Sequence, residues 1–350
     1  MIRGYMRKLS KVEVRDYART LVPVLESHDL DGIKSMRIAD AIISYAMKGL
    51  KPWYRRGSAL QGFASPVFNP MRVIEGYLVY PTPGMNPVVI QSSTLGNAYL
   101  FLDIVGAGGG GGGGASGTVT SSSGNGNGGN GGADGGRLIV MTQGPLPSGT
   151  QFIPAFGGPG GQGNPGPSTG CGNGGNDPGP SGNTQVVLTN GTVSITVPGG
   201  SPAPVPTAPT GQCAGGSGGP GGSAVFTYLS STSIFSTIQL PPRISSFAIQ
   251  NAGVGGAGVG SEYFDPTNST PIFISNPLGT IPSGGSVGTS GSANGKNGGS
   301  ATQNVPSGAI PLRGSGSGGG GGLNLSTGPA AAGGNGGPGG PGPIIVLVIE

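Results

Sequence analysis

Hydrophobic residues in this chain come in short runs rich in Val, Ile and Leu, and long glycine-rich stretches separate these runs. One run leads into seven consecutive glycines at 108–114, and another closes the chain at 344–349 after a stretch of glycine and proline. Short apolar runs bounded by Gly, Pro and Asn are typical of β-strands. We therefore predict strands at 72–79, 87–91, 98–105, 137–142, 150–156, 184–188, 192–197, 224–229, 244–250 and 344–349, and we place the run at 271–275 in loops.

Two features of this pattern predict how the strands are connected. Asn190 and Gly191 separate two alternating runs, which is a strong signal for a β-hairpin. The order of opening strand, glycine stretches and closing strand occurs over 98–230 and again over 231–350, and such repetition indicates folded units. We predict a helical head at 1–60, a connector with short strands at 61–97, and two glycine-rich units.

The head follows helical spacing. Ser10 and Glu13 fit a capping box, in which two side chains satisfy backbone N–H groups at a helix start. The helix that follows is expected to be interrupted and kinked by Pro23. Its apolar face is formed by Val14, Tyr17, Ala18, Leu21, Leu25 and His28.

A second helix is predicted at 31–48, followed by the stop signals Gly49 and Pro52. Its predicted apolar face consists of Ile33, Met36, Ile43 and Met47. Two such helices are too small to bury a core alone. We therefore expect them to pack on a partner or on the next segment of the chain.

Composition raises the question of how so much glycine is ordered. The 350 residues include 78 Gly and 33 Pro, a level at which disorder becomes the default. Collagen is excluded because no strict Gly-X-Y period holds. Only 9% of the residues are charged, whereas disordered chains usually combine low hydrophobicity with high net charge. We therefore expect ordered burial of the glycine-rich stretches.

The left-handed polyproline-II helix is an ordered form that suits these stretches, because it has three residues per turn and no internal hydrogen bonds. Its N–H and C=O groups point outward to neighbouring helices, and helices without Cβ atoms can approach closely. Proline fits the φ angle but lacks the donor. Pro159, Pro220 and Pro338 are therefore expected where an amide would face solvent.

The predicted fold is a small α-helical N-terminal head plus a glycine-rich body of packed polyglycine-II helices bounded by short β-strands, with little α-helix after residue 60. Three stretches carry a family resemblance: LDIVGAGGGGGGG at 102–114, GRLIV followed by FIPAFGGPGG, and GGNGGPGGPGPIIVLVIE at 333–350. The chain resembles, over about 98–350, the glycine-rich domain of bacteriophage tail-fibre proteins and receptor-binding adhesins. In that family, polyglycine-II helices pack as a sandwich.

The resemblance implies a virion-borne adhesin whose rigid scaffold presents loops to a host surface receptor, a protein or a glycan. Binding residues commonly lie on loops that a rigid scaffold carries. The candidate receptor-binding residues are Tyr263, Phe264, Asp265 and Asn268. In the alternative interpretation, Tyr263 and Phe264 fill the scaffold interior. Phe152 and Phe156 are predicted to lie in the core.

The head carries 12 of the 17 Lys and Arg residues and six of the 13 acidic ones. We favour docking of the head onto other virion proteins, with Tyr17, Leu21, Leu25, Ile43 and Met47 as candidate docking residues. Nucleic-acid binding is the rival, and a solvated basic face explains the charges about as well. The basic residues concerned are Arg3, Arg7, Lys8, Lys11, Arg15 and Arg19.

No catalytic pattern is present in the sequence, so we expect no enzyme, no cofactor and no metal site. The chain has one histidine, His28, and its body has scattered acidic residues. The two cysteines, Cys171 and Cys213, lie in glycine-rich surroundings without metal-ligand spacing. A disulfide between them and two free thiols both fit the sequence.

The distribution of apolar residues also predicts where the protein is found. No run approaches the roughly 20 apolar residues that span a bilayer, and the N-terminus lacks the apolar core of a secretory signal. We expect a protein made in the host cytoplasm and placed externally on the virion, in a tail fibre or spike. The alternatives are a capsid or vertex protein without a receptor role and an ice-binding or other structural glycine-rich protein. The choice between monomer and trimer stays open.

Overall fold

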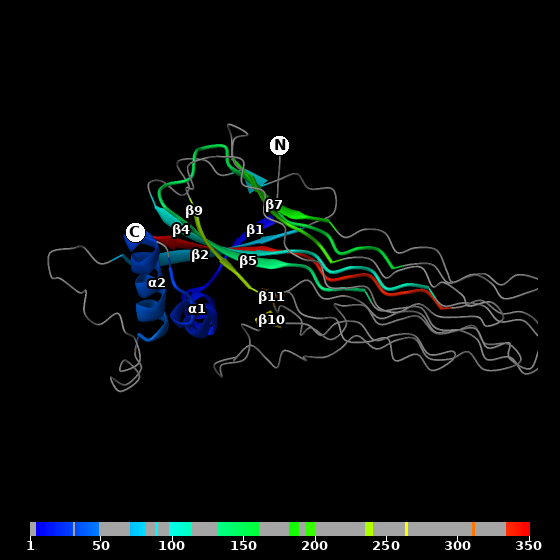
Figure 1. Cartoon of the computed structure of the whole chain (residues 1–350), viewed down its shortest axis with the longest axis horizontal. Helices are drawn as coiled ribbons and strands as arrows, with labels where there is room; N and C mark the ends of the chain where they lie inside the picture. The colour runs from blue at the N-terminus through cyan, green and yellow to red at the C-terminus, as the bar shows by residue number, and fades with distance from the viewer. Residues whose placement is uncertain are drawn as a thin grey trace, which may run out of the picture.

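A six-stranded antiparallel sheet is the centre of the structure, a computed structural model of the chain (Figure 1). Its strand order is β1–β2–β12–β4–β5–β9. The strands are β1 (Tyr5–Lys8), β2 (Val73–Tyr80), β4 (Tyr99–Val105), β5 (Arg137–Thr142), β9 (Phe235–Gln239) and β12 (Ile344–Ile349). The structure describes residues 5–30, 32–48, 71–81, 88–89, 98–113, 132–160, 182–188, 194–200, 235–240, 263–264, 310–311 and 334–350.

The last strand of the chain lies in the middle of this sheet. β12 pairs with β2 on one side and with β4 on the other, both antiparallel. All six of its residues are buried, which explains why the run IIVLVI is apolar at every position instead of alternating. The sheet therefore combines strands from all four of the predicted regions of the chain.

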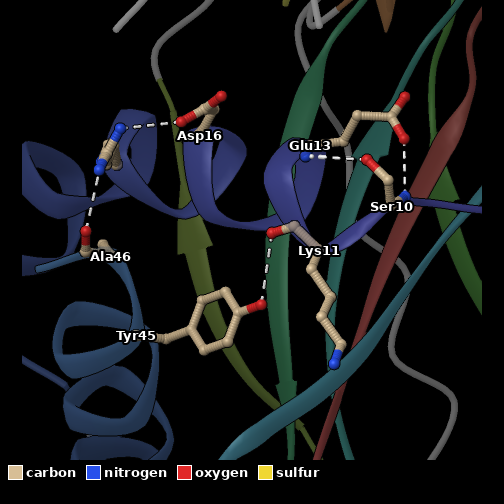
Figure 2. A network of polar contacts seen from close by, with 7 residues as sticks. Ser10, Lys11, Glu13, Asp16, Tyr45 and Ala46 are labelled. Atoms are coloured by element: carbon tan, nitrogen blue, oxygen red, sulfur yellow. Dashed lines mark hydrogen bonds and ion pairs between the residues drawn. The ribbon is translucent and has the colours of Figure 1, made fainter. Parts of the chain in front are cut away.

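Two helices cover one face of the sheet, α1 (Lys11–Glu26) and α2 (Ile33–Ala46). The predicted capping box is present: the Glu13 N–H donates to Ser10 Oγ at 3.2 Å, and the Ser10 N–H donates to Glu13 Oε2 at 2.7 Å (Figure 2). The predicted interruption at Pro23 is wrong, because α1 continues through Pro23 to Glu26. Proline lies close to the helix end, so few backbone bonds depend on it.

The apolar face predicted for α1 is confirmed at Val14, Tyr17, Leu21 and Leu25, all of which are buried. The face predicted for α2 is wrong at Ile33, which is 73% exposed. It is confirmed at Ile43, and the other buried residues of α2 are Ser35, Ile38, Ala39, Ala41, Ile42 and Ala46. Four of these are small residues, which apolar periodicity alone does not identify. The buried Ser35 hydroxyl has a hydrogen-bond partner, because it donates to Ser236 Oγ on β9 at 2.5 Å.

A second, four-stranded sheet packs on the other face of the central sheet. It consists of β3 (Val88–Val89), β6 (Gln151–Ile153), β7 (Thr184–Val187) and β8 (Ser194–Val197). β7 and β8 pair antiparallel, with Thr184 opposite Val197 and Val187 opposite Ser194, as a hairpin through Asn190 and Gly191 requires. Alternate residues of β4 point to opposite layers, Phe101 to the helices and Leu102 to the second sheet.

Other predicted segments lie outside the described residues, and some observed strands were not predicted. The strands predicted at 224–229 and 244–250 and the loop predicted at 271–275 lie outside the described residues. The sequence pattern missed β1, β9 and a short pair formed by β10 (Tyr263–Phe264) and β11 (Ile310–Pro311). In the described part of the chain, both helices precede residue 60. No helix there is both long and apolar enough to cross a membrane.

The position of α1 depends on a glycine in β2. A Cβ atom added at Gly76 would lie 2.6 Å from Val14 Cγ2 of α1 and 3.3 Å from Leu347 Cδ2 of β12. We predict that Gly76→Ala lowers the free energy of unfolding by about 1–3 kcal/mol, because the added methyl group overpacks this contact. Urea denaturation measures the change. Gly144→Ala is the matched control, since a Cβ there meets nothing within 4 Å; equal effects of the two substitutions would contradict the prediction.

Candidate functional site

Five glycine-rich segments leave the strands and run side by side away from the sheets (Figure 1). We call them together the glycine bundle. Segment 106–113 follows β4, 132–136 leads into β5, 155–160 follows β6, 198–200 follows β8, and 334–342 leads into β12. The two layers of strands therefore set the starting positions of the bundle.

Backbone hydrogen bonds within the bundle recur at steps of three residues. Gly106 and Gly109 donate to the carbonyls of Gly136 and Ala133, and Gly108 and Gly111 donate to those of Gly340 and Gly337, at 2.7–3.0 Å. A β-ladder uses a period of two. A step of three residues is the repeat of a helix with three residues per turn.

Segment 106–113 is the centre of the bundle. All eight of its residues are buried. Besides its bonds to 132–136 and 334–342, it accepts a bond from Gly158 N–H at Gly108 O (2.9 Å) and another from Gly200 N–H at Ala107 O (2.7 Å). It is thus bonded to all four other segments, which explains how a run of glycine is held without a hydrophobic side chain.

Close backbone approach, not an unusual φ angle, requires glycine in the bundle. A Cβ at Gly336 would lie 1.9 Å from Gly111 O, one at Gly339 would lie 2.0 Å from Gly108 O, and one at Gly135 would lie 2.1 Å from Gly106 O. Among the described glycines, positive φ angles occur at Gly32 and Gly149, both outside the bundle. No other residue type fits these inner positions.

Burial in the outer segments also repeats every three residues. In 334–340, Gly334, Gly337 and Gly340 are buried, whereas Asn335 and Pro338 are exposed. In 155–160, Ala155 and Gly158 are buried, whereas Phe156 and Pro159 are exposed. The expected outward positions of Pro159 and Pro338 are confirmed, and Pro220 lies outside the described residues.

The two phenylalanines near this region differ in burial. Phe152 is fully buried between the two sheets, as predicted. The core assignment of Phe156 is wrong, because this side chain is 46% exposed. Phe156 belongs to the three-residue repeat of segment 155–160 and takes its outward position, whereas Phe152 belongs to the two-residue alternation of β6.

A buried polar cluster lies where the bundle joins the base, the base being the two helices and two sheets. Arg137 Nε donates to Asp103 Oδ1 at 2.8 Å, and Arg137 Nη2 donates to Asp103 Oδ2 at 2.5 Å. The Tyr17 hydroxyl of α1 also donates to Asp103 Oδ2 at 2.5 Å. All three residues are at most 3% exposed. Asp103 lies near the end of β4, two residues before its last residue Val105, and Arg137 directly follows segment 132–136, so the cluster joins α1 to the start of the bundle.

The chemistry of this cluster is structural. Burial raises the pKa of the Tyr17 hydroxyl well above its ordinary value, and the charge of Asp103 raises it further. The phenol therefore stays neutral and donates its hydrogen bond to the carboxylate. The sequence contained a usable signal for the pair: Asp103 is the single charge within the run 99–105 and Arg137 the single charge of the run 137–142, and burial of a charge requires a partner.

The predicted docking residues are part of the core. Tyr17 and Leu21 are fully buried, Leu25 is 3% exposed and Ile43 is 8% exposed, while Met47 is partly buried against the same cluster. The docking assignment is wrong for the buried four, because their apolar face packs on the sheet of the same chain. Helical periodicity identifies a buried face but not what covers it.

The other predicted site residues have different outcomes. Tyr263 and Phe264 form β10, which pairs with β11. Asp265, Asn268, Cys171 and Cys213 lie outside the described residues. The structure therefore does not bring the four receptor-loop candidates together as a described site.

Basic residues of the head largely join its own elements. Arg7 pairs with Glu13 at 2.9 Å, Lys8 pairs with Glu75, and Arg19 pairs with Asp16 at 2.9 Å. Arg19 Nε also donates to Ala46 O at 3.3 Å, at the end of α2 (Figure 2). Arg15 lies over the ring of Tyr45, 6.0 Å from its centroid. Arg3 is outside the described residues, so the proposed nucleic-acid set is not present as one cluster of unengaged cations.

Among the described residues, no three His, Cys, Asp or Glu side chains gather in a way that could hold a metal ion. The chain matches no protein-family model and no curated protein. The glycine bundle and its buried anchor are therefore the features on which a functional proposal rests.

Removal of one partner from the buried ion pair tests its role. We predict that Arg137→Met lowers the free energy of unfolding by about 3–5 kcal/mol, because the Asp103 carboxylate is left buried without its counter-charge. Asp103→Leu combined with Arg137→Met should recover only part of this loss, because it also leaves the buried Tyr17 hydroxyl without its acceptor. Lys8→Met, which breaks the exposed pair with Glu75, is the control and should cost about 1 kcal/mol or less. Urea denaturation measures all three, and a similar cost for the buried and exposed pairs would contradict the assignment.

The raised pKa of Tyr17 predicts alkaline instability. In the unfolded chain, tyrosine loses its proton near pH 10, whereas the folded chain holds the proton to higher pH. The free energy of unfolding should therefore fall as the pH rises above about 10. Tyr17→Phe should reduce this slope. The remaining part is due to Tyr77, whose pKa is raised to about 12 by burial and by its bond to Glu75, and to Tyr80, whose pKa burial also raises. Denaturation from pH 8 to 12 tests this, and an unchanged slope in Tyr17→Phe would count against it.

Proposed function

We propose that this protein is a virion structural protein that acts as a bacteriophage adhesin, at a tail-fibre tip or on a spike. The observation that carries the proposal is the glycine bundle, which leaves a folded base as closely packed segments that hydrogen bond at three-residue steps. A bundle of this kind forms a rigid structure, built mainly of glycine, that projects from the base. A flexible spacer would not require these backbone hydrogen bonds.

We also propose that the bundle is a lattice of polyglycine-II helices. Three observations support this: hydrogen bonds and burial recur every three residues, and an added Cβ at inner positions would meet a backbone oxygen. Their φ angles are not positive, as a left-handed polyproline-II helix requires. At about 3.1 Å per residue, segment 106–113 spans roughly 25 Å.

In this proposal the base attaches to another virion protein. The buried docking candidates are replaced by residues on the exposed surface of the helices, where Val12 is 62% exposed and Ile33 is 73% exposed. Docking onto protein remains favoured over nucleic-acid contact, since Arg7 and Arg19 already pair within the head and Lys8 pairs with Glu75 of β2. For host recognition the candidates remain Asp265 and Asn268 together with Tyr263 and Phe264, which form the short strand β10.

Two other functions fit the same scaffold. A capsid or vertex protein would use the bundle for structure without binding a receptor. An ice-binding protein would present a regular flat face, but the exposed residues of the outer segments are Phe, Pro and Asn. That mixture does not form the regular rank of small residues or threonines expected of an ice-binding face, so the adhesin is preferred.

Substitutions at inner and outer positions of one segment test the lattice. We predict that Gly339→Ala destabilises the protein by about 2 kcal/mol or more, because its Cβ would meet Gly108 O at 2.0 Å. Pro338→Ala, at the adjacent exposed position, is the control and should change stability by about 1 kcal/mol or less. Thermal unfolding measures both, and hydrogen exchange reports on the amides of 106–113. If Gly339→Ala is as stable as the wild type, the proposed lattice of polyglycine-II helices is wrong.

The adhesin itself is tested on virus particles that carry this chain. Antibodies to the chain should label a fibre tip or spike in electron micrographs, and purified full-length chain should block adsorption of those particles to their host. Heat-denatured chain is the control. Label on the capsid shell without any block of adsorption would support the capsid alternative, and thermal hysteresis of the purified chain would support ice binding.

A further inference from the structure

We propose that the outward residues of the outer glycine segments terminate the bundle laterally, so that separate copies of the chain do not join into one larger lattice. These residues, which we call the edge row, are Phe156, Pro159, Asn335, Pro338 and Pro341. Four of them are exposed and Pro341 is half-buried. The inference rests on the geometry of the bundle and does not depend on a role in a virion.

The edge row occupies one face of the bundle. Segments 155–160 and 334–342 are adjacent: Gly339 N–H donates to Gly158 O at 2.9 Å, and Ala155 and Gly342 exchange two bonds of 2.9 and 3.0 Å. Members of the row follow one another at steps of three within each segment. A helix with three residues per turn returns to the same direction at that spacing, so the row lines the outer side of both segments.

Side-chain bulk along this row prevents a further segment from packing on the side to which these side chains point; on another side, the Phe156 C=O already accepts from Gly182 N–H at 3.0 Å. Where segments of the bundle meet, an added Cβ would come within 1.9–2.3 Å of a backbone atom of the neighbour. Contact of this kind is open only to glycine. A neighbouring chain that approached the edge row would meet a phenyl ring, an amide side chain or a pyrrolidine ring before its backbone could come into hydrogen-bonding range.

Loss of backbone donors is a second barrier. The inner residues Gly158 and Gly339 use their N–H groups inside the bundle, but proline at 159, 338 and 341 has no N–H to offer. An outer surface with unpaired N–H groups would be a template for another glycine segment, as an exposed edge strand is for another sheet. Proline and bulky side chains protect strand edges in the same way.

Analytical ultracentrifugation of the full chain tests the proposal. Wild type and Pro159→Gly/Pro338→Gly are compared over a 100-fold concentration range. The double glycine variant is expected to form larger species as concentration rises, with a weight-average mass at least about twice that of the wild type. Pro159→Ala/Pro338→Ala restores the donors but keeps a methyl group, so it should self-associate less. Pro145→Gly, at an exposed position outside the bundle, is the control for the general effect of losing proline and should match the wild type.

Circular dichroism verifies that each variant is folded. If the double glycine variant does not fold, Asn335→Gly supplies the same test, because it removes one edge side chain and retains all prolines. Wild-type behaviour of the folded glycine variants at every concentration would overturn the proposal. A wild-type oligomer that dissociates in the glycine variants would also overturn it, since the row would then be a contact surface.

Discussion

The structure depends on close backbone approach between segments that carry no side chain at the point of contact. In the glycine bundle, N–H and C=O groups of one segment bond to several neighbours, and carbonyl oxygens occupy the space that a Cβ would need. Glycine loses the most conformational entropy on ordering, so such a body is stable only when nearly every backbone group gains a partner. Backbone hydrogen bonds between segments replace the apolar burial that stabilises ordinary domains.

The base provides the apolar core that the glycine bundle lacks. Two apolar clusters, one under the helices and one between the sheets, hold strands in fixed positions, and the glycine segments continue from those strands. Because β12 lies between β2 and β4, the last residues of the chain complete the sheet that positions the first glycine segment. Tyr17, Asp103 and Arg137 connect the helical layer to the same junction, at the points where the bundle begins and returns.

Much of the local structure was readable from sequence. The capping box at Ser10, the strands at 137–142 and 344–349 and the outward prolines were all predicted, because each depends on local chemistry or on a short period. The partner of the helical pair was left open and the docking residues were misassigned, because an apolar helix face has the same sequence whether it meets another protein or its own sheet. The same limit explains Phe156, whose direction depends on where the two-residue period of β6 changes to a three-residue one.

By itself, the sequence determined most of the described elements, namely both helices and the strands β2 to β8 and β12. It also determined which stretches are too rich in glycine for either and where proline removes a donor. These properties depend on neighbouring residues and on backbone conformational preference. The tertiary structure alone decided which segments meet. It placed the C-terminal strand at the centre of the sheet, paired Asp103 with Arg137 beneath Tyr17, and divided the bundle into inner glycine positions and an outer edge row. Contacts between residues far apart in the chain leave no periodic signal in a single sequence, because any segment with the right shape and free backbone groups would satisfy them.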